Sequence, residues 1–144
     1  MFLTIPMPPN MKVYFDENTS PYIASALNEL EKSENKISVL HTKNEIGQGA
    51  SDPVVVKHVS SHVGVLFSQD DDFKKSKILL NIMNKNPIGL FYFKQPKATK
   101  YWDLVQTYTK CWLHAREIIL NKTTPYYYEI INGGKIKKRD HLVL

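Results

Sequence analysis

The chain has 144 residues, of which 42% are hydrophobic and 23% are charged, so it can form one domain with a buried core. This composition excludes an intrinsically disordered chain, and the single cysteine, Cys111, excludes an internal disulfide framework and a cysteine-rich zinc site. The formal charge of +5, from 19 Lys and Arg against 14 Asp and Glu, is compatible with a polyanionic partner but does not establish one.

Residues 1–10 contain three prolines and are interpreted as an irregular extension ahead of the domain. Met11 directly precedes the first strand-like segment, which makes it a candidate for the native start. No apolar run has the length needed to cross a bilayer, so we expect no membrane contact. The lone thiol at Cys111, expected to be buried, suits a reducing, cytoplasmic setting.

Strands and helices alternate from residue 12 onward. Residues 12–15 form a short apolar segment rich in aromatic side chains, which predicts a buried strand. Ser20 and Pro21 form a helix start signal, and residues 21–32 are predicted to form an amphipathic helix with Ile23, Ala26, Leu27 and Leu30 on its apolar face. Residues 36–41 are the second predicted strand, expected to lie parallel to the first.

The middle of the chain repeats this pattern. Residues 42–51 are predicted to be a loop, and Asp52 with Pro53 begins a second helix. The third strand lies within residues 63–68. A further helix is predicted over residues 74–84, with an inward face formed by Ile78, Leu79, Ile82 and Met83.

The last part of the chain contains a fourth predicted strand, the longest helix and a hairpin. Residues 88–93 form the strand, and residues 101–120 form the helix, with an apolar face made of Trp102, Val105, Tyr108, Trp112 and Ile119. Residues 126–131 and 135–137 are predicted strands joined by a tight turn at the sequence Asn-Gly-Gly.

Alternating strands and helices predict parallel βαβ units, and therefore an α/β fold in which residues 11–144 form a single domain. In such sheets the ligand site lies beyond the carboxyl ends of the strands, at a switch in strand order. Any polar residues that directly follow the strands should therefore gather at one edge.

Acidic residues follow the first and third strands, as Asp16 with Glu17 and the run from Asp70 to Asp72, and Asp52 begins the second helix, so all three groups are expected at this edge. Carboxylates held close together repel one another unless a proton or a cation relieves the repulsion. Their hard oxygen atoms suit Mg²⁺ or Mn²⁺, which catalyse phosphodiester hydrolysis when held in this way. The alternative is local: Asp52 can cap a helix, and Asp16 and Glu17 can end a strand.

The segments with the sequences MKVYFDEN (residues 11–18), GASD (49–52) and VLFSQDDDF (65–73) resemble the short PIN-like family. The longer tail, with its helix at residues 101–104 and its final Gly-Gly-Lys hairpin, is similar to members described as VapC-type toxins. This resemblance extends from about residue 11 to the end of the chain. It implies a PIN-like three-layer sandwich with a mainly parallel central sheet and a C-terminal hairpin.

The resemblance also implies an activity, which is Mg²⁺- or Mn²⁺-dependent ribonuclease cleavage by the toxin of a toxin-antitoxin pair. By position, Asp16, Asp52 and Asp70 would be the metal ligands and catalytic acids, with Asp72 assisting. RNA would be the substrate, a separate antitoxin protein would block the site, and a homodimer is a family expectation. Full-length relatives usually carry another acid on a helix between the first two sites, and Asp71 makes it ambiguous which acids of the run face the metal.

Two sets of side chains outside the acidic motif are candidate binding residues. Lys74, Lys75, Lys94 and Lys97 follow the third and fourth strands, where they can contact RNA phosphates or simply remain solvated. His58 and His62 lie one helical turn apart, but the glutamate of the zinc-helix motif is absent between them, so they are interpreted as structural.

Two other classes of function remain open at this point. A signalling receiver also places acids after its first and third strands and a lysine late in the chain, for which Lys94 would serve, but Asp52 would then have no role. A PIN-like module that binds RNA or protein without cutting is the other alternative. RNA retention without metal-dependent cleavage would identify it.

Overall fold

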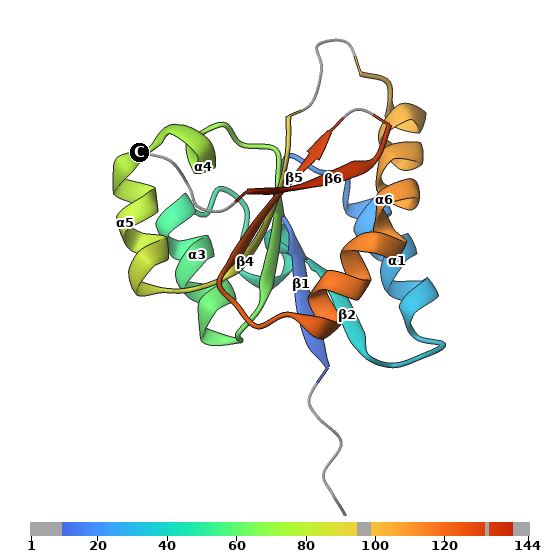
Figure 1. Ribbon diagram of the computed structural model, residues 1–144, viewed down its shortest axis with the longest axis horizontal. Helices are drawn as coiled ribbons and strands as arrows, with labels where there is room; N and C mark the ends of the chain where they lie inside the picture. The colour runs from blue at the N-terminus through green and yellow to red at the C-terminus, as the bar shows by residue number, and fades with distance from the viewer. Residues whose placement is uncertain (1–9, 95–98, 132, 140–144) are drawn as a thin grey trace, which may run out of the picture.

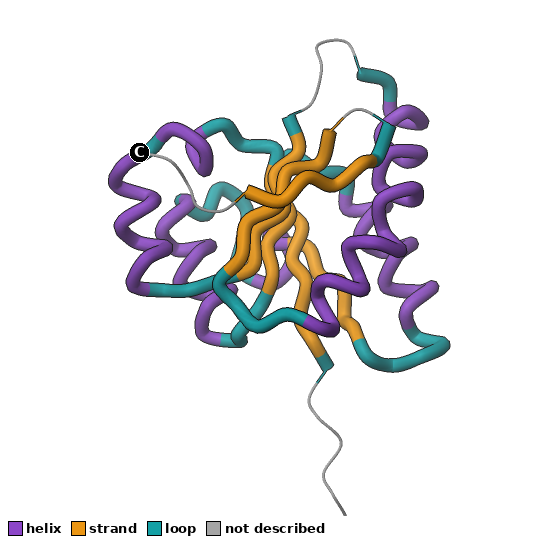
Figure 2. Tube along the Cα trace, in the orientation of Figure 1, coloured by secondary structure: helices purple, strands orange, loops and turns teal. Residues whose placement is uncertain are grey.

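The computed structural model describes residues 10–94, 99–131 and 133–139. Within these ranges, six strands form one twisted sheet with helices on both faces, so the molecule has three layers (Figure 1, Figure 2). The elements in chain order are β1 (Met11–Phe15), α1 (Pro21–Glu31), β2 (Ile37–His41), α2 (Thr42–Glu45), α3 (Asp52–Ser61), β3 (Val65–Ser68), α4 (Asp72–Lys75), α5 (Lys77–Lys85), β4 (Gly89–Phe93), α6 (Tyr101–Asn121), β5 (Tyr126–Ile131) and β6 (Lys135–Arg139). Among the helices of the described residues, none combines the length and apolar character that crossing a membrane requires.

The sheet has the strand order β2-β1-β3-β4-β5-β6. The first five strands are parallel to their neighbours, and β6 returns antiparallel to β5 as the predicted hairpin. The chain leaves β1 for β2 on one side and then returns to place β3 on the other side of β1. The order therefore switches between β1 and β3, which is where ligand sites form in sheets of this kind.

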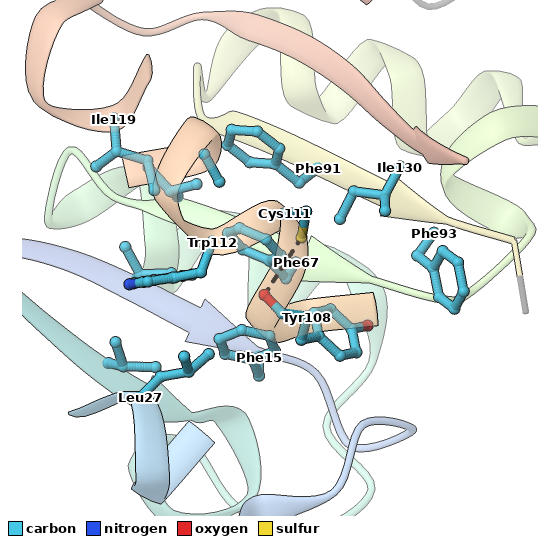
Figure 3. Close-up of a cluster of buried hydrophobic side chains, with 14 of the residues drawn as sticks. Phe15, Leu27, Phe67, Phe91, Phe93, Tyr108, Cys111, Trp112, Ile119 and Ile130 are labelled. Carbon is cyan, nitrogen blue, oxygen red and sulfur yellow. Dashed lines mark hydrogen bonds between the residues drawn. The ribbon is translucent and has the colours of Figure 1, made fainter. Parts of the chain in front are cut away.

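One face of the sheet is covered by α1 and α6 (Figure 2). Aromatic rings from three neighbouring strands stack there, with centroid separations of 4.8 Å between Phe15 and Phe67 and 4.6 Å between Phe67 and Phe91. Tyr108 and Trp112 of α6 lie against this stack (Figure 3). Cys111 is buried in the same cluster, as the sequence predicted, and burial raises the pKa of its thiol to about 12.

The opposite face is covered by α3, α4 and α5 (Figure 1). Because successive side chains of a strand point to opposite faces, Tyr14 of β1, Leu66 of β3 and Leu90 of β4 face this second core. Val56 and Val59 of α3 pack against them and are fully buried. This packing stabilises a helix whose run of β-branched residues has weak intrinsic helical propensity.

A charged network joins the two helices on the first face. The Glu31 carboxylate is buried at the end of α1, where it accepts hydrogen bonds from Trp112 Nε1 at 2.7 Å and from Arg116 Nε at 3.0 Å. These bonds and the guanidinium charge outweigh the effect of burial and lower the pKa of the carboxyl. Arg116 also pairs with Glu34, just beyond α1.

The structure differs from the sequence predictions in two connecting segments. Residues 42–45 form the short helix α2 in place of a loop, because the His41 ring accepts a hydrogen bond from the Lys43 amide and caps the turn. The single helix predicted over residues 74–84 is divided into α4 and α5. The division falls at Ser76, whose backbone is extended and whose hydroxyl accepts a hydrogen bond from the Leu79 amide at the start of α5.

Several predicted apolar faces are also rotated. Trp102 is 71% exposed, because it lies two residues before the buried Leu104 and therefore on nearly the opposite side of α6. In α1, Ala26 and Leu30 are exposed, and Ala24 and Glu31 take the buried positions. In α5, Ile78 is exposed while Leu80 faces inward.

Candidate functional site

A cavity of about 130 Å³ lies at the carboxyl edge of the sheet, at the switch between β1 and β3. Its lining residues come from the ends of the strands and from the helices that follow them: Asp16, Glu17, Asn18, Thr42, Ala50, Asp52, Val55, Asp70 and Phe73. Acids from three separate segments of the sequence, Asp16, Asp52 and Asp70, therefore lie around one cavity.

Asp16 follows β1 and is fixed by hydrogen bonds on both carboxylate oxygens. The Ser68 hydroxyl donates to Oδ2 at 2.5 Å, the Gln69 amide donates to Oδ2 at 3.2 Å, and the Asn18 amide donates to Oδ1 at 3.2 Å. The side chain is only 8% exposed, and burial raises the pKa of its carboxyl, although these hydrogen bonds favour the ionised form. Asp16 is therefore a pre-positioned acid on the inner side of the cavity.

Asp52 is the first residue of α3 and lies one position inside the helix, after the N-cap Ser51. The pKa of its carboxyl is raised to about 6. The causes are partial burial, the negative charge of Asp70 together with a hydrogen bond to it, and the charges of Asp72 and Asp16. A raised pKa with these causes indicates carboxylates held close enough to resist simultaneous ionisation.

Asp52, Asp70 and Asp72 form a group in which one carboxylate oxygen from each residue lies within 4.8 Å of the others. The Asp70 backbone amide donates to Ser68 Oγ at 3.0 Å, and Asp70 Oδ1 accepts from the Asp72 amide at 3.0 Å, which fixes the turn carrying two of the three acids. Asp16 lines the same cavity but is outside this group of three.

The run of three aspartates divides between two roles. Asp72 begins α4 and belongs to the group of three, whereas the Asp71 carboxylate accepts a hydrogen bond from the Tyr92 hydroxyl and lies 4.0 Å from Lys75 Nζ. Asp70 and Asp72 therefore approach Asp52, whereas Asp71 contacts β4.

Glu17 and Asn18, which follow Asp16 in the sequence motif, also line the cavity. Glu17 accepts a hydrogen bond from the Gly49 backbone amide and so connects the β1 end to the loop before α3. Gly49 has φ of +76°, which places it in the left-handed region that favours glycine. This contact holds together the two segments that carry Asp16 and Asp52.

Thr42 is a cavity residue that the sequence interpretation missed. It begins α2 and is 1% exposed, and its hydroxyl has no hydrogen-bond partner among the described residues. The signal was available: β1 and β2 are parallel, and Thr42 directly follows β2 just as Asp16 directly follows β1. A threonine carries no charge, so the acidic pattern that predicts the site does not include it.

The structure describes the side chains of two of the four lysines predicted as RNA contacts. Lys94 is exposed beyond the carboxyl end of β4, at the same edge of the sheet as the cavity. Lys75 is also exposed, beside Asp71. The side chain of Lys74 and the whole of Lys97 lie outside the described residues.

His58 and His62 pack beside a core tyrosine, away from the cavity-lining set. Their rings are 4.9 Å apart, and the Tyr14 ring lies 5.5 Å from that of His58 and 6.4 Å from that of His62. Neither histidine belongs to the group of three carboxylates. These contacts agree with the structural interpretation made from the sequence.

Comparison with protein families matches the first part of the chain. A family model described as a PIN like domain matches residues 11–95, the segment from β1 to just beyond β4. No curated protein and no solved structure matches the chain. The matched segment contains every acid that lines the cavity.

Proposed function

The chain belongs to the PIN-like domain family, whose members are generally nucleases, and we propose that it is a metal-dependent ribonuclease that hydrolyses RNA phosphodiester bonds. The observation that carries this proposal is the close approach of Asp52, Asp70 and Asp72 beside the buried Asp16 at the topological switch point.

The donor set fits a divalent cation. Three carboxylate oxygens within 4.8 Å of one another offer hard ligands of the kind that Mg²⁺ and Mn²⁺ prefer. Burial and the charges of the neighbouring acids both raise the pKa of Asp52, so these carboxylates are held together at a cost when no cation is present. A bound cation would relieve this repulsion and would supply Lewis-acid stabilisation of the phosphate.

We assign the direct cation contacts to Asp52, Asp70 and Asp72. Because both oxygens of Asp16 already accept hydrogen bonds, its carboxylate acts from the inner wall of the cavity, either as a further ligand or by orienting the attacking water. One of these carboxylates accepts a proton from the attacking water. The water oxygen attacks phosphorus, and the P–O bond to the leaving oxygen breaks.

Contacts with the rest of the RNA are part of the same proposal. Lys94, exposed at the cavity edge of the sheet, and Lys75 on α4 would contact phosphates of the strand. Such contacts position RNA without reading its sequence. We further propose that the protein is the toxin of a toxin-antitoxin pair, whose antitoxin covers the acidic cavity, and that it is a homodimer.

The activity is tested with 5′-labelled single-stranded RNA incubated with the purified protein and Mn²⁺ or Mg²⁺. We expect cleavage that EDTA abolishes and that falls at least a hundredfold in Asp52→Asn, Asp70→Asn and Asp16→Asn. Asp71→Asn is the matched control. It removes a neighbouring charge from the same turn but from a side chain directed to Tyr92, so cleavage should persist.

Equal cleavage by all four variants and the native chain would indicate a contaminating nuclease and contradict the proposal. RNA binding that survives EDTA, with no cleavage under any cation, would instead identify a non-catalytic RNA-binding module.

The toxin role is tested separately: induced expression should arrest growth in the native form and not in Asp70→Asn. Size-exclusion chromatography with light scattering tests the homodimer.

A further inference from the structure

The position of Thr42 follows from the register of the two neighbouring strands. Phe15 of β1 is paired with His41 of β2, so the next residues, Asp16 and Thr42, leave the sheet side by side at the same edge. Thr42 lines the cavity that Asp16, Asp52 and Asp70 also line. It is the polar residue that β2 contributes to this site.

The Thr42 hydroxyl differs from the other buried hydroxyl groups around the site. Ser68 Oγ donates to Asp16, and Thr19 Oγ1 both contacts Asp16 and accepts a hydrogen bond from Gln69 Nε2. Thr42 Oγ1 has no hydrogen-bond partner among the described residues, although the residue is only 1% exposed. An unpaired buried hydroxyl is destabilising, and in native proteins it indicates a missing partner.

The backbone holds Thr42 in this position. Its carbonyl oxygen accepts hydrogen bonds from the Ile46 amide at 2.9 Å and the Gly47 amide at 3.2 Å. The ring of the preceding residue, His41, is hydrogen-bonded through Nε2 to the Thr19 carbonyl at 2.8 Å. With the backbone fixed and the residue 1% exposed, its hydroxyl has no direct access to solvent. A partner has to come to it, and the cavity is the space in which one can be held.

We propose that Thr42 is a positioning residue whose hydroxyl hydrogen-bonds the hydration shell of the divalent cation held by Asp52, Asp70 and Asp72. This inference rests on the proposed cation site. Small hard cations such as Mg²⁺ keep several of their waters when protein carboxylates bind them. The cavity lining also includes the apolar residues Ala50 and Val55, which offer such waters no side-chain hydrogen bond.

The test compares Thr42→Val, which keeps the shape and removes the hydroxyl, with Thr42→Ser, which keeps the hydroxyl. Mn²⁺ affinity is measured by calorimetry without RNA, and the melting temperature is measured in EDTA and in saturating Mn²⁺. In EDTA we expect Thr42→Val to be at least as stable as the native chain, because an unpaired buried hydroxyl has been removed.

With Mn²⁺ the order should reverse. Thr42→Val should bind Mn²⁺ about fivefold more weakly, the effect of one lost hydrogen bond, and its cation-induced rise in melting temperature should shrink accordingly. Thr42→Ser should bind as the native chain does. Thr109→Val, the same exchange on the exposed surface of α6, is the matched control and should also bind normally.

The outcomes separate the two proposals. If the native chain binds no Mn²⁺, or if Asp52→Asn binds it equally well, the cation site itself is wrong and the role of Thr42 falls with it. If the native chain binds Mn²⁺ and Asp52→Asn does not, but Thr42→Val binds as tightly as the native chain, only the Thr42 inference is overturned. Should Thr42→Val fold poorly, Thr42→Ala provides the same comparison of affinity.

Discussion

At the residue scale, the consequence most open to measurement is the cost of holding Asp52 beside other acids. Its pKa is about 6 in the folded protein against an ordinary value of 3.8. The folded state therefore binds this proton more tightly than the unfolded state. The free energy of unfolding consequently falls as the pH rises from about 4 through about 6, and the loss is nearly complete at about pH 7.

Asp52→Asn should accordingly be more stable than the native chain when no cation is present. At pH 7.5 in EDTA we expect its melting temperature to be higher by about 2 °C, a small value because water screens a half-exposed group. The difference should shrink as the pH falls from 6 to 4, where the native carboxyl becomes neutral. Differential scanning calorimetry across this pH range measures the effect.

Asp103→Asn is the control for that measurement. Asp103 is exposed in the first turn of α6, where its charge interacts favourably with the helix dipole. Its replacement should leave the melting temperature unchanged or slightly lower it. If Asp52→Asn behaves in the same way as Asp103→Asn, the carboxylates around the cavity do not repel one another as the geometry indicates.

At the element scale, hydrogen bonds from Trp112 and Arg116 to the Glu31 carboxylate join α6 to α1. Arg116→Met leaves the Glu31 carboxylate buried with Trp112 as its remaining close donor among the described residues, so we expect the free energy of unfolding to fall by about 3 kcal/mol. Adding Glu31→Gln should restore much of this loss by removing the buried charge. Urea denaturation of the single and double variants measures the coupling.

The exposed pair of Lys32 and Glu29 provides the contrast. Its Nζ–Oε2 distance is 2.8 Å, similar to the distances in the buried network, but both side chains are mostly in solvent. Lys32→Met should therefore change the free energy of unfolding by less than about 0.5 kcal/mol. A loss for Arg116→Met no larger than this would show that α1 and α6 are not joined through Glu31.

The β5–β6 hairpin contacts α6 through its turn. Gly134 has φ of +81°, and a Cβ atom there would lie 2.8 Å from Lys110 Cβ and 3.1 Å from the Thr107 carbonyl oxygen. Gly133 has nearly the same φ of +83° but open space around it. Gly133→Ala therefore carries only the backbone penalty, about 1 kcal/mol, and Gly134→Ala should cost about 1–3 kcal/mol more through the clash.

Thermal unfolding of these two glycine variants, measured by circular dichroism, checks the comparison. Equal losses of stability in the two variants would mean that the turn can move away from α6 without cost, and that the hairpin is not fixed against that helix.

At the scale of the whole molecule, the sequence predicts the order and type of the elements well because apolar residues are spaced differently in strands and in helices. Short apolar runs indicate buried strands, and helices carry start signals such as Ser20 with Pro21. Since parallel strands end at one edge, the gathering of Asp16, Asp52 and Asp70 there could also be expected.

What the sequence could not supply depends on contacts between distant segments. The burial of Glu31 requires Arg116, which is 85 residues away, and the separation of Asp71 from Asp72 requires Tyr92. The place of Thr42 after β2 follows from the parallel strands, but the burial of its unpaired hydroxyl depends on packing that no local pattern reveals. Trp102 was misassigned because α6 has more large apolar residues than its buried stripe can hold.

The family match ends at residue 95, but the fold that holds the acids does not. The face of the sheet bearing Phe15, Phe67 and Phe91 is covered largely by α6, which contributes seven buried residues. Each large apolar side chain that loses this cover forfeits about 1.5–3 kcal/mol, so the sum is comparable to the whole stability of about 5–15 kcal/mol for a domain.

We therefore predict that a fragment of residues 11–95 does not fold, although it contains every acid of the cavity. It should show no cooperative thermal transition by circular dichroism, bind hydrophobic dyes and bind Mn²⁺ much more weakly than the full chain. A fragment of residues 11–139 should retain cooperative unfolding and full Mn²⁺ affinity. If the shorter fragment unfolds cooperatively and binds Mn²⁺ normally, the first four strands with the helices of the opposite face suffice to position the site, and α6 serves another purpose.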